Sequence, residues 1–154
     1  MDNSIKAIII GASVVITLVI VSIGFLVLRQ GQEAAGGAID QIGKLNSQMS
    51  EADKTMYDGR EVSGSEVVNV LSRFKNENIG IIVKTGKNTG GSSYIRSLTV
   101  EGDGTGSISA GGNPIANTLD ESKSDYVNPN GRFKGKVIRD KNGTIVGIVF
   151  EQQT

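Results

Sequence analysis

The stretch Arg132-Phe-Lys-Gly-Lys-Val-Ile-Arg-Asp-Lys-Asn-Gly-Thr-Ile-Val-Gly-Ile-Val-Phe-Glu151 decides the fold of the C-terminal part of the chain. It holds two runs rich in β-branched residues, one on each side of Asp140-Lys-Asn-Gly143. The Asn142-Gly143 dipeptide suits the positive φ angles of a type I′ turn, which matches the twist of paired strands. We therefore predict a β-hairpin over residues 132–152.

The register of this hairpin defines a face that another element must cover. A turn centred on Asn142-Gly143 pairs Arg139 with Val146 and Val137 with Ile148. One face then carries four apolar side chains: Val137, Val146, Ile148 and Phe150.

A short helix precedes the hairpin and is a suitable cover for that face. Ser63-Gly-Ser-Glu66 has the spacing of a capping box, in which the serine hydroxyl and the glutamate carboxylate satisfy backbone amides. The spacing predicts a helix from about Gly64 to Lys75. Its apolar side chains recur at helical spacing: Val67, Val70, Leu71 and Phe74.

Two further strands are expected, at Ile79–Thr85 and Tyr94–Val100, because both runs are branched and bounded by turn residues. The glycine-rich segments 85–93 and 102–112 read as flexible loops. Tyr57-Asp58-Gly59 supplies a turn at the start of this region. The predicted class is α+β: a long N-terminal hydrophobic and amphipathic helix, then a domain over residues 57–154 with one helix on three to five antiparallel strands, ending in the hairpin.

The segment 29–56 is polar with a regular apolar stripe. Its members recur at alternating spacings of three and four residues, which is a heptad pattern: Ala35, Ala38, Ile42, Leu45, Met49, Ala52 and Met56. We call these seven residues the helix seam. One interpretation is a stripe that packs on the chain's own domain. The other is self-association of identical chains along this helix.

Ala7 to Leu28 is an uncharged apolar stretch, and a helix of this length spans about 33 Å, enough to cross a bilayer. The alternative is a cleaved signal peptide, but no Ala-x-Ala-like site follows Leu28. We predict a transmembrane helix over 7–28, a short cytoplasmic N-terminus over 1–6, and an extracytoplasmic domain over 57–154.

Composition excludes several functional classes. The chain has 16 basic and 16 acidic side chains, so nucleic acid is not an expected partner. It has no cysteine and no histidine, which removes the commonest nucleophile, general base and metal ligands. We expect no enzyme activity, no cofactor, no metal and no small-molecule substrate.

The local motifs of the sequence do not meet the requirements of catalysis or metal binding. The carboxylate pairs Glu101/Asp103 and Asp120/Glu121 lie in polar loops, whereas a general acid needs a desolvated site. The segment Asp125–Gly131 has acidic and amide side chains, but its spacing departs from that of a calcium loop. Gly86-Lys87 lacks the earlier glycine of a phosphate loop, and the Asn142-Gly-Thr144 sequon is read as the hairpin turn.

The layout of charged N-terminus, membrane helix, continuing amphipathic helix and small sheet domain resembles that of type IV pilins. When Gly11 is aligned with the cleavage glycine of that family, Ile16 stands where pilins usually carry a glutamate. Met56-Tyr-Asp-Gly59, Val62-Ser-Gly-Ser65 and the stretch Tyr126–Gly143 also resemble small single-pass membrane proteins of Gram-positive bacteria and their mobile elements.

The predicted function is a structural subunit of a surface filament or envelope assembly, which is what the pilin resemblance implies. Its partners would be the lipid bilayer and further copies of the chain, joined through the N-terminal helix. The alternative is a membrane-anchored binding or accessory module of a secretion, conjugation or phage apparatus, acting through the loops 86–93 and 102–124.

Overall fold

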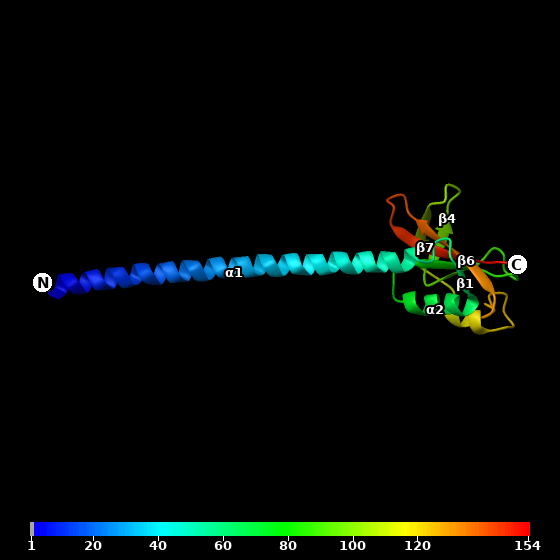
Figure 1. Cartoon of the computed structure of the whole chain (residues 1–154), viewed down its shortest axis with the longest axis horizontal. Coiled ribbons are helices and arrows are strands. Elements are labelled where there is room, and N and C mark those ends of the chain that lie inside the picture. The colour runs from blue at the N-terminus through cyan, green and yellow to red at the C-terminus, as the bar shows by residue number, and fades with distance from the viewer. Residues whose placement is uncertain (1) are drawn as a thin grey trace. The chain divides into compact units, whose positions relative to one another are not determined.

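The computed structural model describes residues 2–154 and divides the chain into two compact units, residues 1–48 and 49–154. Helix α1 runs unbroken from Asp2 to Thr55, so it enters both units (Figure 1). Its most apolar 18-residue window has a mean hydropathy of 2.7 and no buried residue. The long N-terminal helix is therefore confirmed, and α1 is long and apolar enough to cross a membrane once.

The second unit is an α+β domain, as the sequence predicts. A five-stranded sheet has the order β1-β6-β7-β2-β3, and a separate hairpin pairs β4 with β5. The strands are β1 Glu61–Ser63, β2 Gly80–Lys84, β3 Ser92–Tyr94, β4 Ser97–Val100, β5 Gly106–Ser109, β6 Arg132–Arg139 and β7 Ile145–Gln152. The helices are α2, Gly64–Phe74, and the short 3-10 helix η1, Ile115–Leu119.

The expected purely antiparallel sheet is wrong at one position, because β2 pairs with β7 in parallel. Helix α2 connects β1 to β2 and carries the chain back across the sheet, so β2 starts at the end where β1 started. The predicted strand at 94–100 is also broken. Ile95 has a φ of 68°, and this turn separates β3 from β4.

The segment 102–112, expected to be a loop, contains β5, which pairs with β4 through Val100↔Gly106 and Leu98↔Ile108. The apolar content of β5 is one isoleucine among glycine and serine, so its strand character depends on the partner strand.

The hairpin of β6 and β7 is confirmed, and Val137 pairs with Ile148 as predicted. The pairing of Arg139 with Val146 is wrong: a bulge between Ile138 and Arg139 pairs Arg139 with Ile145. The turn is not type I′ either, because Gly143, with a φ of 84°, is the residue in the left-handed region and Asn142 is not. Asp140 holds this wider turn by accepting hydrogen bonds from the amides of Asn142 and Thr144.

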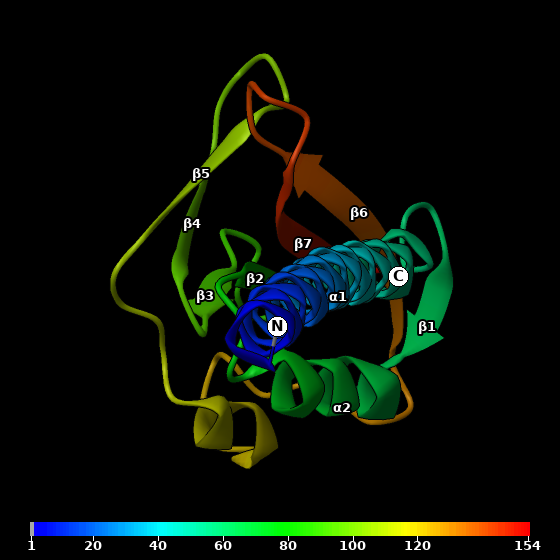
Figure 2. The same cartoon turned by 90° about the vertical axis from the view of Figure 1, so that its left-hand side faces the viewer.

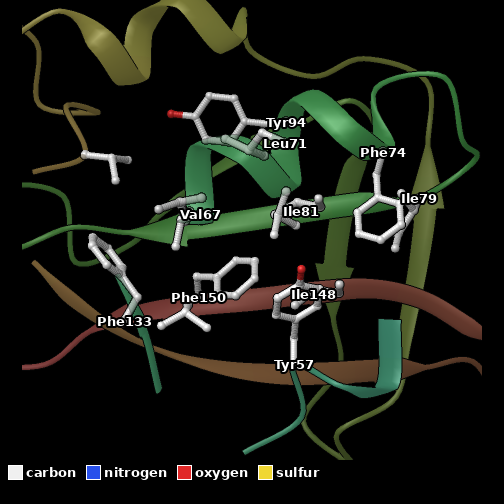
Figure 3. Close-up of a cluster of buried hydrophobic side chains, with 14 of the residues drawn as sticks. Tyr57, Val67, Leu71, Phe74, Ile79, Ile81, Tyr94, Phe133, Ile148 and Phe150 are labelled. Atoms are coloured by element: carbon white, nitrogen blue, oxygen red, sulfur yellow. The ribbon is translucent and has the colours of Figure 1, made fainter. Parts of the chain in front are cut away.

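One face of the sheet is covered by α2. The Ser63 hydroxyl accepts a hydrogen bond from the Glu66 amide, which is one half of the predicted capping box. Figure 3 shows the side chains of α2 above those of the sheet. The central members of this core are buried: Val67, Leu71, Phe74, Ile81, Phe133, Ile148 and Phe150.

The other face of the sheet is covered only in part, by the β4–β5 hairpin. Leu98 is 5 % exposed and packs against two glycine residues of the sheet, Gly80 and Gly147. A Cβ at Gly147 would lie 2.3 Å from the Leu98 side chain and 2.8 Å from the Gly80 carbonyl oxygen, and a Cβ at Gly106 would lie 2.5 Å from Ile138. Glycine at these positions is therefore what lets the hairpin reach the sheet.

Gly147→Ala is expected to lower the free energy of unfolding of the domain by about 1–3 kcal/mol, because the added methyl group overpacks Leu98 and the Gly80 backbone. Urea unfolding in detergent, followed by tyrosine fluorescence, measures this in residues 49–154, where all three tyrosines lie. The matched control is Gly102→Ala, where a Cβ meets nothing within 4 Å. Equal midpoints for the two variants would contradict the close packing.

Tyr94 lies in the core with its ring fully buried (Figure 3). Its hydroxyl has no hydrogen-bond partner among the described residues. Burial, together with the nearby charge of Asp125, raises the pKa of Tyr94 to about 12. A buried hydroxyl without a partner costs free energy that a phenylalanine does not.

Tyr94→Phe is expected to raise the free energy of unfolding by about 1 kcal/mol at neutral pH. The unfolded chain releases the Tyr94 proton near pH 10, whereas the folded domain holds it up to about pH 12. The stability linked to this proton is thus present below pH 10 and is lost as the pH rises to about 12. The variant should lose part of that alkaline slope, and an unchanged slope in urea titrations at pH 9–12 would contradict the assignment.

Candidate functional site

The structure places six of the seven helix-seam residues on α1 and Met56 in the turn directly after its end at Thr55, and all seven are exposed. Ile42 is 58 % exposed, Leu45 54 % and Met49 68 %. Ile39, next to the seam, is 70 % exposed. The last three seam residues, Met49, Ala52 and Met56, lie within the second unit, and there too they are exposed rather than packed on the domain.

The end of α1 contacts its domain through a different face. Lys54 bonds to Glu77 and Ser50, and its ammonium lies 5.7 Å from the centre of the Phe74 ring. Asp53 pairs with Arg73 of α2, and Glu51 pairs with Arg139 of β6 at 2.8 Å. Polar contacts therefore attach the last two turns of the helix, while Met49, Ala52 and Met56 beside them remain exposed.

Lys54 is the least exposed member of these ion pairs, at 13 % for the side chain. Lys54→Met removes its charge while keeping an apolar stem, and leaves Glu77 without its nearest cation. We expect the opening free energy of the amides at 50–56, measured by hydrogen exchange in detergent, to fall by about 1–2 kcal/mol. Lys44→Met, at an exposed position of the same helix, is the control and should leave those amides unchanged.

A second surface is a groove of about 500 Å³ on the sheet face opposite α2, which we call the outer groove. Its floor is apolar and comes from three adjacent strands: Ile82 of β2, Val149 of β7 and Ile138 of β6. Val100, at the end of β4, forms one wall. The groove exists because the β4–β5 hairpin covers the cross-strand pair Gly80 and Gly147 but does not reach the next pair on that face, Ile82 and Val149.

Charged side chains form the opposite wall of the outer groove. In register across the strands, Lys84 neighbours Glu151, and Glu151 neighbours Lys134. Lys84 and Glu151 lie 3.9 Å apart. Lys136 lines the groove next to Val149, and none of the ion pairs in residues 2–154 uses Lys134 or Lys136. The groove thus combines an apolar floor with two lysines, Lys134 and Lys136, that form no ion pair within residues 2–154.

The carboxylate pairs of the sequence lie in exposed loops. Hydrogen bonds from Thr105 hold the pKa of Asp103 below its usual value, and hydrogen bonds from Ser122 do the same for Asp120. These shifts keep both groups ionised, which is the reverse of what a general acid needs.

Asp125 organises the loop before β3. Its Oδ1 accepts hydrogen bonds from Asn88 Nδ2 at 2.9 Å and from Ser92 Oγ at 2.7 Å. The Asn128 side chain instead accepts from the Asn130 amide. Asp125 therefore binds the segment 86–92, which is a hydrogen-bonded loop, while Asn128 bonds within its own turn. Within the described part of the chain, no group of three His, Cys, Asp or Glu side chains is placed to hold a metal.

Comparison of the chain with models of protein families, with curated proteins and with solved structures found no match. The functional argument therefore depends on the two surfaces, the helix seam and the outer groove. Sequence reasoning found the first and missed the second. The available signal was the alternation of Lys134 and Lys136 with buried residues in β6, which puts both lysines on the face away from α2.

Proposed function

We propose that the protein is a membrane-anchored structural subunit whose copies associate through α1 and present the domain of residues 57–154 outside the membrane, as in a surface filament or envelope assembly. The observation that carries this proposal is the unbroken helix Asp2–Thr55, along which the membrane segment continues directly into the exposed helix seam. Residues 29–55 extend the helix about 40 Å beyond a bilayer crossed at 7–28.

Exposed apolar side chains on residues 29–55 of α1 supply the driving force for association between copies. Burying a leucine, isoleucine or methionine side chain that would otherwise face water stabilises by about 1.5–3 kcal/mol. Ile39, Ile42, Leu45 and Met49 are each more than half exposed on a single helix. A second copy that packs its own seam against this one covers these side chains on both copies.

The heptad spacing also continues toward the membrane, which favours association over the whole helix. Val21, Gly24, Leu28 and Gly31 keep the alternation of three and four residues that begins again at Ala35. A Cβ at Gly24 or Gly31 would meet nothing within 4 Å, so a partner helix has room to approach closely there.

A second candidate function is the anchored binding module, now favoured by the outer groove rather than by the loops 86–93 and 102–124. The groove falls in the size range of ligand sites and has polar groups above an apolar floor. This function would require no contact between copies, so the test of the helix seam separates the two.

Single-cysteine variants test the proposal directly, because the chain has no cysteine of its own. Ile42→Cys and Met49→Cys lie on the helix seam, and we expect each to form a disulfide dimer in membranes after mild oxidation. Ser47→Cys, between them and off the seam, is the matched control and should form little. The measurement is the dimer fraction on non-reducing gels.

Electron microscopy of material sheared from cells, with the intact mass of the subunit, then shows whether the associated chains form filaments. Ile42→Asp with Leu45→Asp should abolish the assembly and leave the domain folded. If Ser47→Cys forms as much dimer as Ile42→Cys, or if the aspartate variants assemble normally, the proposed association is wrong.

A further inference from the structure

Leu119 and the two acidic residues after it form an exposed apolar and anionic projection, which we call the Leu119 tip (Leu119, Asp120 and Glu121). Among the large apolar side chains of residues 57–154, Leu119 is the most exposed, at 65 %. Asp120 and Glu121 are both exposed beside it.

The Leu119 tip is held in place from below. Thr118 is fully buried, its hydroxyl donates to the Ile115 carbonyl at 2.7 Å, and its own carbonyl accepts from the Val127 amide at 2.9 Å. The amide and the hydroxyl of Ser122 both donate to Asp120 Oδ1. A leucine on a fixed turn loses little freedom on binding, which favours its use as an anchor.

The outer groove has the complementary chemistry. An apolar side chain fits its floor of Ile82, Val149 and Ile138, and carboxylates beside that side chain would meet Lys134 and Lys136. The ion pairs already described use neither of these lysines. Lys84 is paired with Glu151, and Asp58, also in the groove, accepts from the Val137 amide.

The two surfaces lie on opposite sides of the sheet. Helix η1, which ends at Leu119, packs beside α2, and Ile115 of η1 contacts the core under α2. The outer groove lies on the face that the β4–β5 hairpin covers in part. In Figure 2 the yellow turn of η1 lies next to α2 and away from β5. One copy therefore cannot place its own tip in its own groove.

We infer that the Leu119 tip of one copy docks in the outer groove of the next copy, with Asp120 and Glu121 facing Lys134 and Lys136. Such a contact joins two different surfaces, so it repeats from copy to copy in an open head-to-tail row instead of closing as a symmetric pair. The inference rests on the proposed function, because a contact this small needs the high local concentration that association through α1 provides.

Two differently tagged single-cysteine chains, Leu119→Cys and Val149→Cys, test this in the full-length protein in membranes. Co-expression and mild oxidation should give a mixed disulfide dimer that carries both tags. Neither variant alone should form a disulfide dimer, because each cysteine faces a native surface of the neighbouring copy. Asn76→Cys, at an exposed position outside the tip and the groove, replaces Leu119→Cys in the control and should give no mixed dimer.

Charge reversal tests whether Asp120 and Glu121 of one copy face Lys134 and Lys136 of the next. Lys134→Glu with Lys136→Glu, added to the Val149→Cys chain, should abolish the mixed dimer. Asp120→Lys with Glu121→Lys, added to the Leu119→Cys chain, should restore it. Lys141→Glu, at the exposed hairpin turn, is the matched control and should leave the dimer unchanged. Loss without restoration would overturn the inference.

The Ile42→Cys disulfide, measured in the same membranes, separates the two proposals. If Ile42→Cys forms its dimer and the mixed Leu119–Val149 dimer is absent, the head-to-tail contact is refuted and association through α1 stands. If neither forms, the proposed function fails and the contact fails with it.

Discussion

The domain depends on the burial of β7 from both sides. Ile148 and Phe150 point into the core under α2, while Gly147, between Val146 and Ile148, lies under Leu98 of the β4–β5 hairpin. A central strand in the middle of a sheet with both faces covered contributes more apolar burial than one with a single covered face. The order of the sheet follows from it: β6 joins β7 through a local hairpin, and β2 reaches its other edge after the α2 crossover. The same arrangement produces the outer groove, because a two-stranded hairpin is too narrow to cover the whole face.

Local patterns predicted the parts of this fold that depend on neighbours in sequence. The hairpin, α2 and β2 each carry their own period and boundary signals, and the structure has all three. The parallel pairing of β2 with β7 and the short strand β1 depend on segments far apart in the chain, so the periodicity within each strand does not predict them. Strand β5 depends on its neighbour β4, because its own sequence has little strand character. The bulge at Ile138 and Arg139 is likewise a feature that the local sequence pattern does not predict. Asn142-Gly143 indicates a turn, but the side chain of Asp140 selects a wider one by binding two amides.

The two candidate surfaces, the helix seam and the outer groove, differ in the same way. The helix seam is a one-dimensional pattern on a single helix, and its residues could be named from spacing alone. The outer groove is built from β2, β6, β7 and the end of β4, so its composition appears only once the sheet order is known. The glycine positions alone do not predict the outer groove. In the sequence Gly80, Gly106 and Gly147 look like ordinary strand interruptions, although each marks a close approach between two layers.

The end of α1 connects these surfaces. At about 100° per residue, Met49 and Ala52 lie on one side of α1, and Ser50, Asp53 and Lys54 lie on another. Because the ion-paired side attaches the helix end to α2 and β6 and the seam side stays exposed, attachment to the domain leaves the seam side available for the proposed packing between helices. The ion pairs also fix the rotation of residues 49–56 relative to the sheet. In the proposed association along these residues, the three salt bridges would therefore set the orientation of each outer groove and each Leu119 tip relative to the helix contact.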